Sequence, residues 1–274
     1  MNKLRILELF GGIGACSKAL ERSGIDYEIA DYVEIDKYAV KSFNAIHNTN
    51  FEPQDICEWN KDIEVDLIMH GSPCQDFSLA GKQAGGDKGS GTRSSLMYET
   101  IRIVSKLKPK YVIWENVKNL LSKKHRHNFD AYLETMEQLG YTNFYQVLNA
   151  KDYGIPQNRE RVFTISIRKD INKLFTFPPK QELKLKLKDM LENEVDEKYY
   201  LSDIFMNKIK YSGNTEEDLI DIINSTKKGY LEAYEGDSVN LAYPDSKTRR
   251  GRVGKQLSQT LQTTDNIGVV TKDK

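Results

Sequence analysis

A thiol directly after a short apolar run is the first sign of chemistry in this sequence. The run VDLIMH, residues 65–70, has the length and composition of a buried strand, and Cys74 follows it after Gly-Ser-Pro. A cysteine is intrinsically a strong nucleophile, although only a small fraction of it is thiolate at neutral pH. Ligands of open α/β sheets bind beyond the carboxyl ends of the strands. The sequence therefore favours Cys74 as a nucleophile beside a bound ligand.

A carboxyl group and two guanidinium groups also lie at or beside the ends of expected strands. Glu115 lies in WENV, at the end of a second apolar run, where its neighbours would half bury it. A carboxylic acid in such a place can be kept protonated and act as a hydrogen-bond donor. Arg159 and Arg161, in QNRERVF, are two residues apart, so an extended segment would present both on one face. All three are candidate catalytic residues.

A glycine-rich loop follows the first expected strand. In ELFGGIG, the glycines at positions 11, 12 and 14 let the backbone turn tightly and approach a nucleotide closely. The spacing is not a dinucleotide fingerprint, because Ser17 stands where the third glycine would be. The pattern disfavours pyrophosphate binding. It fits a nucleoside site, or a plain tight turn.

Two acidic residues follow this loop. Glu34 ends the next expected strand about twenty residues on, where a carboxylate can accept hydrogen bonds from both ribose hydroxyls. Asp55, in QDIC, could accept a hydrogen bond from an adenine amino group, with Ile56 against the ring. Many nucleoside-binding α/β domains would show this pattern, and two solvated carboxylates would show it as well.

The segment after Cys74 is rich in glycine and carries several cations. GKQAGGDKGSGTR holds five glycines together with Lys82, Lys88 and Arg93. So much glycine predicts a mobile segment, either one that closes over a ligand or a plain surface loop. The cations suit contacts with a nucleic-acid phosphate backbone.

Strand-like and helix-like segments alternate through the first two-thirds of the chain. The expected strands cover residues 4–10, 27–36, 65–70, 111–116, 143–150 and 161–167. The expected helices cover residues 16–24, 37–47, 94–108 and 128–140. This alternation predicts an α/β fold with a doubly wound, mostly parallel sheet. Pro178 and Pro179 end the pattern, so we expect a first domain over residues 1–177 and a smaller region over 178–274.

The net charge of the chain and the distribution of its charges limit which classes of partner it could bind. The 274 residues carry 40 basic and 40 acidic side chains, so no global field attracts an acidic partner and any nucleic-acid surface must be a local patch. The stretch KTRRGRVGK is such a patch, although a solvated charge run would look the same. Its cations are Lys247, Arg249, Arg250, Arg252 and Lys255.

Other bulk features indicate the compartment. No apolar run reaches the length of a membrane span and the N-terminus lacks a signal-peptide layout, so we expect a cytoplasmic protein. The three cysteines show no metal or disulfide spacing, and Cys16 and Cys57 are expected to be small buried residues. His125 and His127 lack further ligands and are expected to be polar surface residues, so no metal site is predicted.

The motifs FGGIG, VEID, DI, GSPCQDFSLAG, WENV and QNRERVF, in this order, resemble the bacterial DNA cytosine-5 methyltransferases over about residues 4–170. The resemblance implies a Rossmann-like domain that depends on S-adenosylmethionine, and a region that recognises double-stranded DNA, in a restriction-modification or phage context. The residues that match the family's donor site are Phe10, Gly12, Ile13, Gly14, Glu34, Ile35, Asp55, Ile56, Pro73 and Leu96. Those expected to contact DNA are Gln75, Ser78, Lys82, Arg93, Arg249, Arg250 and Arg252.

The resemblance also implies a reaction. Cys74 would add to C6 of a cytosine flipped out of the duplex, which makes C5 nucleophilic enough to take a methyl group. Glu115 would hydrogen-bond and protonate N3, while Arg161 and Arg159 would hold O2 and offset developing negative charge. Loss of the C5 proton would then release Cys74.

Two elements that follow the recognition region in the family are not found here. They are an arginine-rich helix and a Gly-Asn-Ser-Val-like segment that completes the donor pocket. The chain could therefore be the larger half of a split enzyme with a small partner chain, a truncated product, or a binding protein without turnover, each with little activity alone. An RNA cytosine methyltransferase is less favoured because of the basic recognition-like segment, and a nicotinamide-dependent oxidoreductase because the third glycine is absent.

Overall fold

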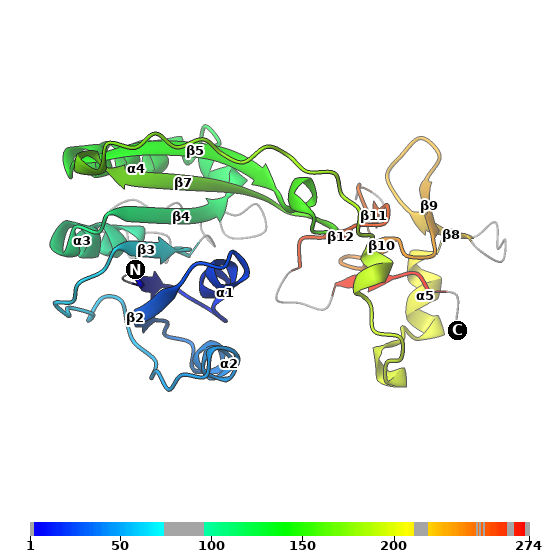
Figure 1. Cartoon of the computed structure of the whole chain (residues 1–274). Helices are drawn as coiled ribbons and strands as arrows, with labels where there is room; N and C mark the ends of the chain where they lie inside the picture. The colour runs from blue at the N-terminus through cyan, green and yellow to red at the C-terminus, as the bar shows by residue number, and fades with distance from the viewer. Residues whose placement is uncertain are drawn as a thin grey trace. The chain divides into compact units, whose positions relative to one another are not determined.

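The computed structural model describes residues 3–73, 96–210, 219–244, 246, 248, 250–261 and 266–271. The chain divides into two compact units (Figure 1). Unit 1 holds Met1–Leu148 and Arg161–Pro178, and unit 2 holds Asn149–Glu160 and Pro179–Lys274. The chain thus enters unit 2 briefly before it completes unit 1, an excursion that a single boundary near residue 177 does not include.

Unit 1 is built from alternating strands and helices. Its strands are β1 (Leu4–Leu9), β2 (Tyr27–Val33), β3 (Leu67–His70), β4 (Tyr111–Val117), β5 (Tyr141–Asn149) and β7 (Glu160–Arg168). Its helices are α1 (Ala15–Arg22), α2 (Lys37–His47), α3 (Met97–Leu107) and α4 (Arg126–Gln138). Each of these elements overlaps a segment expected from the sequence, and the predicted α/β class is confirmed.

Six strands form one sheet in the order β2-β1-β3-β4-β7-β5, with β5 and β7 at the top of the view in Figure 1 and β2 at the bottom. β1 pairs in parallel with β2 and with β3, and β3 pairs in parallel with β4. The sheet is mostly parallel, as predicted, but β7 runs antiparallel to β4. The connection from β5 to β7 holds one turn of 3-10 helix (Ala150–Tyr153), which is too short for the crossover that a parallel return needs.

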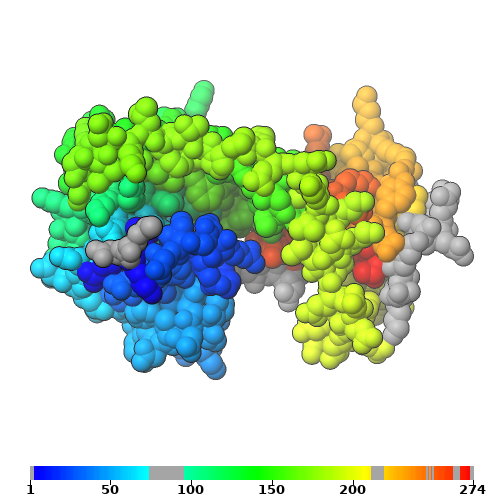
Figure 2. All heavy atoms as spheres, in the orientation of Figure 1, coloured from blue at the N-terminus to red at the C-terminus, as the bar shows by residue number. Residues whose placement is uncertain are grey.

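The two faces of this sheet are covered by different helices. On one face, Leu7 and Trp114 pack in a cluster that includes side chains of α3 and α4. On the other face, Ile6 and Met69 pack with Leu20 of α1. Successive residues of a strand point to opposite faces, so Ile6 and Leu7 belong to different clusters. Figure 2 shows the blue N-terminal and green central residues of this unit packed against each other.

Unit 2 consists of short elements. Its strands are β6 (Gln157–Asn158), β8 (Leu219–Ile223), β9 (Tyr230–Tyr234), β10 (Ser238–Asn240), β11 (Val253–Gly254), β12 (Ser258–Gln259) and β13 (Ile267–Val269), and its helix is α5 (Asp203–Ile209). β6 pairs with β12, β8 with β9, and β10 lies between β11 and β13. A small core around Ile209, Ile222 and Val239 holds these elements together.

No described helix has both the length and the apolar composition that crossing a membrane requires. No group of three or more histidine, cysteine, aspartate or glutamate side chains in the described ranges could hold a metal ion. The expectation that His125 lies on the surface is wrong, because this residue is 1% exposed at the start of α4.

A buried polar cluster lies at the end of β3. His70 is 2% exposed, and its ring stacks on Trp114 with 5.6 Å between the ring centroids. Its ring nitrogens lie 3.2 Å from the Tyr132 hydroxyl and 3.5 Å from the Thr100 hydroxyl. Burial lowers the pKa of His70 to about 3, because a charged imidazolium would lose its hydration. His70 is therefore neutral in the folded protein at physiological pH.

This buried histidine should make the protein sensitive to acid. Its pKa is 6.5 in the unfolded chain and about 3 in the folded one, so the unfolded chain binds more protons between these values. The stabilisation is fully present above pH 6.5, and we predict that acidification removes about 1.4 kcal/mol per pH unit below it. Urea unfolding at pH 7 and at pH 5 measures the loss.

A matched pair of variants isolates the contribution of His70. His70→Gln keeps a hydrogen-bonding side chain but removes the titration, so its stability should depend less on pH than that of the wild type. His127→Gln, at an exposed position of α4, is the control and should keep the wild-type dependence. Equal pH dependence in the wild type and His70→Gln would contradict the assignment.

Candidate active site

The register of the parallel strands brings four strand ends to one edge of the sheet. Leu9 of β1 pairs with Val33 of β2 and with His70 of β3, and His70 pairs with Trp114 of β4. The residues that come next along these four strands are Phe10, Glu34, Gly71 and Glu115. Because parallel strands point the same way, all four residues lie at the carboxyl edge, where α/β sheets bind ligands.

The loop between β1 and α1 has a left-handed backbone at three positions. The angle φ is 53° at Phe10, 54° at Gly12 and 86° at Gly14. Glycine adopts this conformation freely, whereas for Phe10 it costs about 1 kcal/mol. A side chain at Gly14 would also meet His47, since a Cβ there would lie 2.2 Å from Nε2 of its ring. Phe10 and Leu96, both expected in the donor site, are partly buried against the main core.

The glycine loop leaves room for a ligand and offers it suitable groups. Apart from Gly12 and its chain neighbours, no atom of the described residues lies within 4 Å of the point where a Cβ of Gly12 would stand. Glu34 accepts hydrogen bonds from the N–H of Gly12 at 3.1 Å and from that of Asp36 at 2.9 Å, and its oxygens retain further acceptor capacity. Ile13 and Ile35 are 58% and 66% exposed. Open space, a carboxylate and exposed apolar side chains fit a nucleoside such as that of S-adenosylmethionine.

Asp55 and Ile56 lie on a turn beside the end of β2. The N–H of Gln54 donates to the Glu34 carbonyl at 2.8 Å, which ties this turn to Glu34. The Asp55 carboxylate accepts from the N–H of Cys57 at 2.8 Å, and Cys57 is exposed in this turn, not buried as expected. Ile56 is 5% exposed because its side chain packs in the core. Contact of Ile56 with an adenine ring stays a prediction, with little free surface for it.

The segment that leads to Cys74 is anchored to β4. Ser72 is buried, and its hydroxyl accepts from Nε1 of Trp114 at 3.0 Å while its carbonyl accepts from Nδ2 of Asn116 at 3.2 Å. These two partners flank Glu115 in β4, and Pro73 follows Ser72. The expected site residues Cys74, Gln75, Ser78, Lys82, Arg93 and Arg249 lie outside the described residues. Their roles stay predictions.

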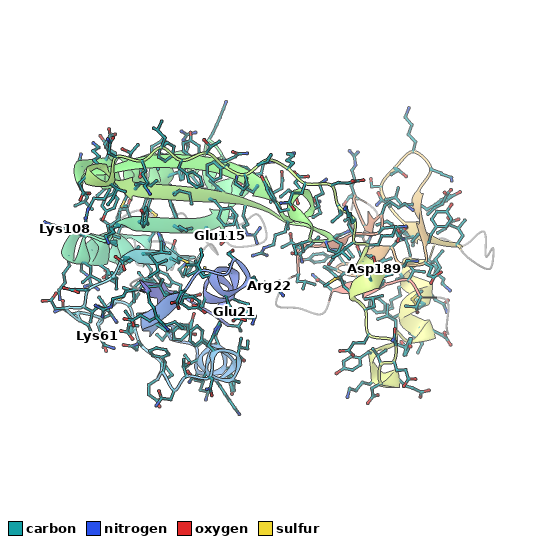
Figure 3. All side chains as sticks on the ribbon, in the orientation of Figure 1. Glu21, Arg22, Lys61, Lys108, Glu115 and Asp189 are labelled. Carbon is teal, nitrogen blue, oxygen red and sulfur yellow. The ribbon has the colours of Figure 1, made fainter. Side chains whose placement is uncertain are left out.

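An ion pair joins β4 to the antiparallel strand β7. Arg161 pairs with Val117, so it stands diagonally across from Glu115, within reach of a long side chain. Nε of Arg161 lies 2.8 Å from Oε1 of Glu115, and the two side chains are 16% and 31% exposed. Figure 3 labels Glu115 at the carboxyl edge of the sheet. The structure thus brings together two of the expected catalytic residues, by a contact that the sequence did not reveal.

Arg159 belongs to unit 2, in the connection between β6 and β7. Its N–H donates to Oδ1 of Asn149 and its carbonyl accepts from the N–H of Ala150, both at 3.1 Å. The motif QNRERVF therefore spans both units, because Arg161 lies in unit 1. Joint action of Arg159 and Arg161 on one ligand stays a prediction.

The structure buries Arg252, against the expectation that this residue contacts DNA. Its side chain is 1% exposed. Its guanidinium donates to the backbone carbonyls of Asn240, Ala242, Tyr243, Pro244 and Ser246. A buried guanidinium needs such partners, and here it holds together the turn that follows β10. Arg250, two residues earlier, is exposed and remains a candidate DNA contact.

Similarity to known proteins identifies the family of this chain. The profile of the C-5 cytosine-specific DNA methylases matches residues 4–273, nearly the whole chain. The chain belongs to this family. The resemblance read from the motifs is confirmed, and S-adenosylmethionine is the methyl donor of the family.

Two curated relatives and one solved structure show how far the likeness extends. The type II methyltransferase M2.ScrFI of Lactococcus lactis subsp. cremoris is 37% identical over 253 residues, which cover 72% of this chain and 70% of that protein. The orphan methyltransferase M.SPRI of Bacillus phage SPR is 31% identical over 329 residues, which cover 100% of this chain and 74% of that protein. A DNMT2 variant of Spodoptera frugiperda shares the fold, with a TM-score of 0.65 at 22% identity over 92% of this chain and 74% of that one.

From the burial of Arg252 we predict that its guanidinium stabilises unit 2 against unfolding. Arg252→Met keeps much of the aliphatic volume but leaves several carbonyls without their donor, so unit 2 should lose about 3 kcal/mol of its free energy of unfolding. Arg250→Met, at the exposed position, should change that free energy by less than about 0.5 kcal/mol. Hydrogen exchange of the amides in residues 238–254 during urea titration measures both. Equal protection in the two variants would contradict the structural role of Arg252.

Proposed function

We propose that this chain methylates C5 of cytosine in double-stranded DNA. The observation that carries the proposal is the Glu115–Arg161 ion pair, at the sheet edge that also holds the glycine loop and the anchored segment before Cys74. The basic side chains Lys82, Arg93, Arg249 and Arg250 are proposed to contact DNA, together with Gln75 and Ser78. The names of the bacterial and phage relatives support a restriction-modification or phage setting, in the cytoplasm of the host.

Cys74 is proposed as the nucleophile. Its thiolate adds to C6 of a cytosine that has been flipped out of the duplex, and the new sulfur–carbon bond displaces ring electrons towards C5. The hydrogen bonds from Trp114 and Asn116 to Ser72 fix the chain just before this thiolate. A fixed approach lowers the entropy cost of bringing the sulfur to C6.

Glu115 and Arg161 are proposed to hold the edge of the flipped pyrimidine. Glu115, whose carboxylate is ion-paired with Arg161, takes up a proton from solvent and donates it to N3, and Arg161 donates to O2, where negative charge develops on addition. Their ion pair sets the two groups in place before the base arrives, so little reorganisation is needed at the moment of reaction. Arg159 is proposed as a further donor to O2.

The residues around the glycine loop are proposed to hold S-adenosylmethionine. Glu34 would accept from the ribose hydroxyls and Asp55 from the adenine amino group, with Ile13 and Ile35 supplying apolar contact. Further contacts are proposed for Phe10, Gly12, Gly14, Ile56, Pro73 and Leu96. When bound, S-adenosylmethionine supplies the electrophilic methyl group that C5 of the adduct accepts. After the methyl transfer, which leaves the donor as a neutral thioether, the C5 proton passes to solvent and the C6–sulfur bond breaks with its electrons on Cys74. The N3 proton returns to Glu115, so the aromatic ring and the free thiolate are restored.

Covalent trapping tests the role of Cys74. A duplex library with 5-fluorocytosine in random flanking sequence removes the need to know the recognised site. We predict an adduct that needs S-adenosylmethionine and survives a denaturing gel, because fluorine at C5 cannot leave as a proton and Cys74 is not released. Cys74→Ala should form no adduct, whereas Cys57→Ala, which removes an exposed thiol, should form it as the wild type does.

The other outcomes of this trap identify the alternatives. An adduct with a matching RNA library but not with DNA would replace the DNA substrate by RNA. Absence of an adduct, with donor and DNA binding intact, would favour a non-catalytic binding protein. A strong adduct with the purified chain would exclude the alternative that a second chain is needed for activity.

Replacement of Glu115 tests the proposed proton transfer at N3. Glu115→Gln keeps the size of the side chain but cannot deliver the proton, so kcat should fall about 100-fold or more. The donor affinity should stay unchanged, because Glu115 is not proposed to touch S-adenosylmethionine. Glu134→Gln, on the exposed side of α4, is the matched control and should keep the wild-type kcat. An unchanged kcat in Glu115→Gln would remove this residue from the reaction.

A further inference from the structure

We propose that Tyr32 is a positioning residue for the methyl donor, acting through the glycine loop. This inference rests on the proposed function, since it assigns a task to the loop as the donor site. Two side chains, one in β2 and one directly after it, hydrogen-bond to the N–H and the carbonyl of Gly12. Glu34 accepts from the Gly12 N–H at 3.1 Å, and the Tyr32 hydroxyl donates to the Gly12 carbonyl at 2.5 Å.

The ring of Tyr32 is fixed by packing. It is 0% exposed, and it stacks on Phe43 of α2 with 3.8 Å between the ring centroids. It also lies directly beneath the loop, because a Cβ at Gly11 would stand 2.5 Å from Cε2 of Tyr32. Burial, with the nearby Glu34 carboxylate adding to it, raises the pKa of Tyr32, so the hydroxyl remains a proton donor towards Gly12.

The loop needs such a restraint. Gly12 has a left-handed φ of 54°, and no other part of the described chain fills the space where its side chain would be, so its own packing does little to fix it. Glycine also loses more conformational entropy than other residues when it is ordered. Hydrogen bonds at both sides of Gly12 therefore preorganise the backbone before the donor arrives, which reduces the cost of binding.

Tyr32 and Glu34 do not have the same task. Glu34 is proposed to accept from the ribose hydroxyls, so its hydrogen bond with Gly12 must share the carboxylate with the ligand. Tyr32 is fully buried and is not available to a ligand. In this proposal, the hydrogen bond from Tyr32 to Gly12 persists when the donor is bound. Tyr32 therefore maintains the loop conformation while Glu34 accepts hydrogen bonds from the ribose.

The variant Tyr32→Phe isolates the hydroxyl, because the ring and its stacking on Phe43 are retained. Calorimetric titration with S-adenosylmethionine, without DNA, should give a Kd raised about threefold to tenfold, the effect of one hydrogen bond. The KM for the donor should rise by the same factor, with kcat at saturating donor within about twofold of the wild type. This split separates positioning of the loop from a catalytic role.

Tyr141→Phe is the matched control. Tyr141 is 1% exposed, and its hydroxyl also donates to a backbone carbonyl, that of Pro109, at 2.7 Å. It lies in β5, at the opposite edge of the sheet from β2. The control variant should lose comparable thermal stability without any change in the Kd for the donor.

Gly11→Ala approaches the same hydrogen bond from the other side. The added methyl would press on the Tyr32 ring and should also raise the Kd for the donor. If both substitutions act through the Tyr32–Gly12 hydrogen bond, the double variant should lose less affinity than the product of the two single losses. Independent, multiplicative losses would contradict this coupling.

The outcomes separate the inference from the function on which it rests. An unchanged Kd in Tyr32→Phe, while the wild type binds the donor, would overturn the inference and leave the proposed function standing. An equal rise of the Kd in Tyr141→Phe would assign the effect to general stability and would overturn it as well. A folded wild-type chain that does not bind S-adenosylmethionine would overturn the proposed function, and the inference with it.

Discussion

The parallel register of β2, β1, β3 and β4 is the constraint on which the site depends. It aligns four strand ends in one row, so loops that are far apart in the sequence leave the sheet at the same edge. The first two strands deliver the groups proposed to bind the donor, and the next two deliver those proposed to be catalytic. Side chains alternate along β4, so Trp114 is buried and Glu115 reaches the ligand edge. A slip of one residue would exchange them and remove the site.

The antiparallel strand β7 supplies the cationic partner of Glu115. It returns beside β4 and sets Arg161 diagonally across from Glu115. A half-buried ion pair costs desolvation and contributes little net stability in many proteins. Under the proposed function, its value lies in holding Glu115 and Arg161 together at the edge of the sheet that would receive the flipped pyrimidine.

The sequence predicts the local part of this structure well and the non-local part poorly. The strands and helices could be predicted because hydrophobic periodicity is a property of a few neighbouring residues. The positions of Gly12, Glu34 and Glu115 near strand ends follow from that periodicity. The pairing of β6 with β12 joins residues a hundred positions apart, and nothing in either segment encodes the partner. The burial of Arg252 could not be predicted from the sequence, because its partners are backbone carbonyls, which every residue has.

Tyr32 was missed for a different reason, and the signal was present. Glu34 was recognised because an acid after the second strand is expected to bind a ribose. A residue two positions earlier in an extended chain lies on the same face, so Tyr32 is directed towards the same loop as Glu34. A tyrosine in the middle of an apolar strand also needs a partner for its hydroxyl. The loop carbonyl of Gly12 is that partner, so one strand both hydrogen-bonds the glycine loop and leads to the carboxylate proposed to meet the ligand.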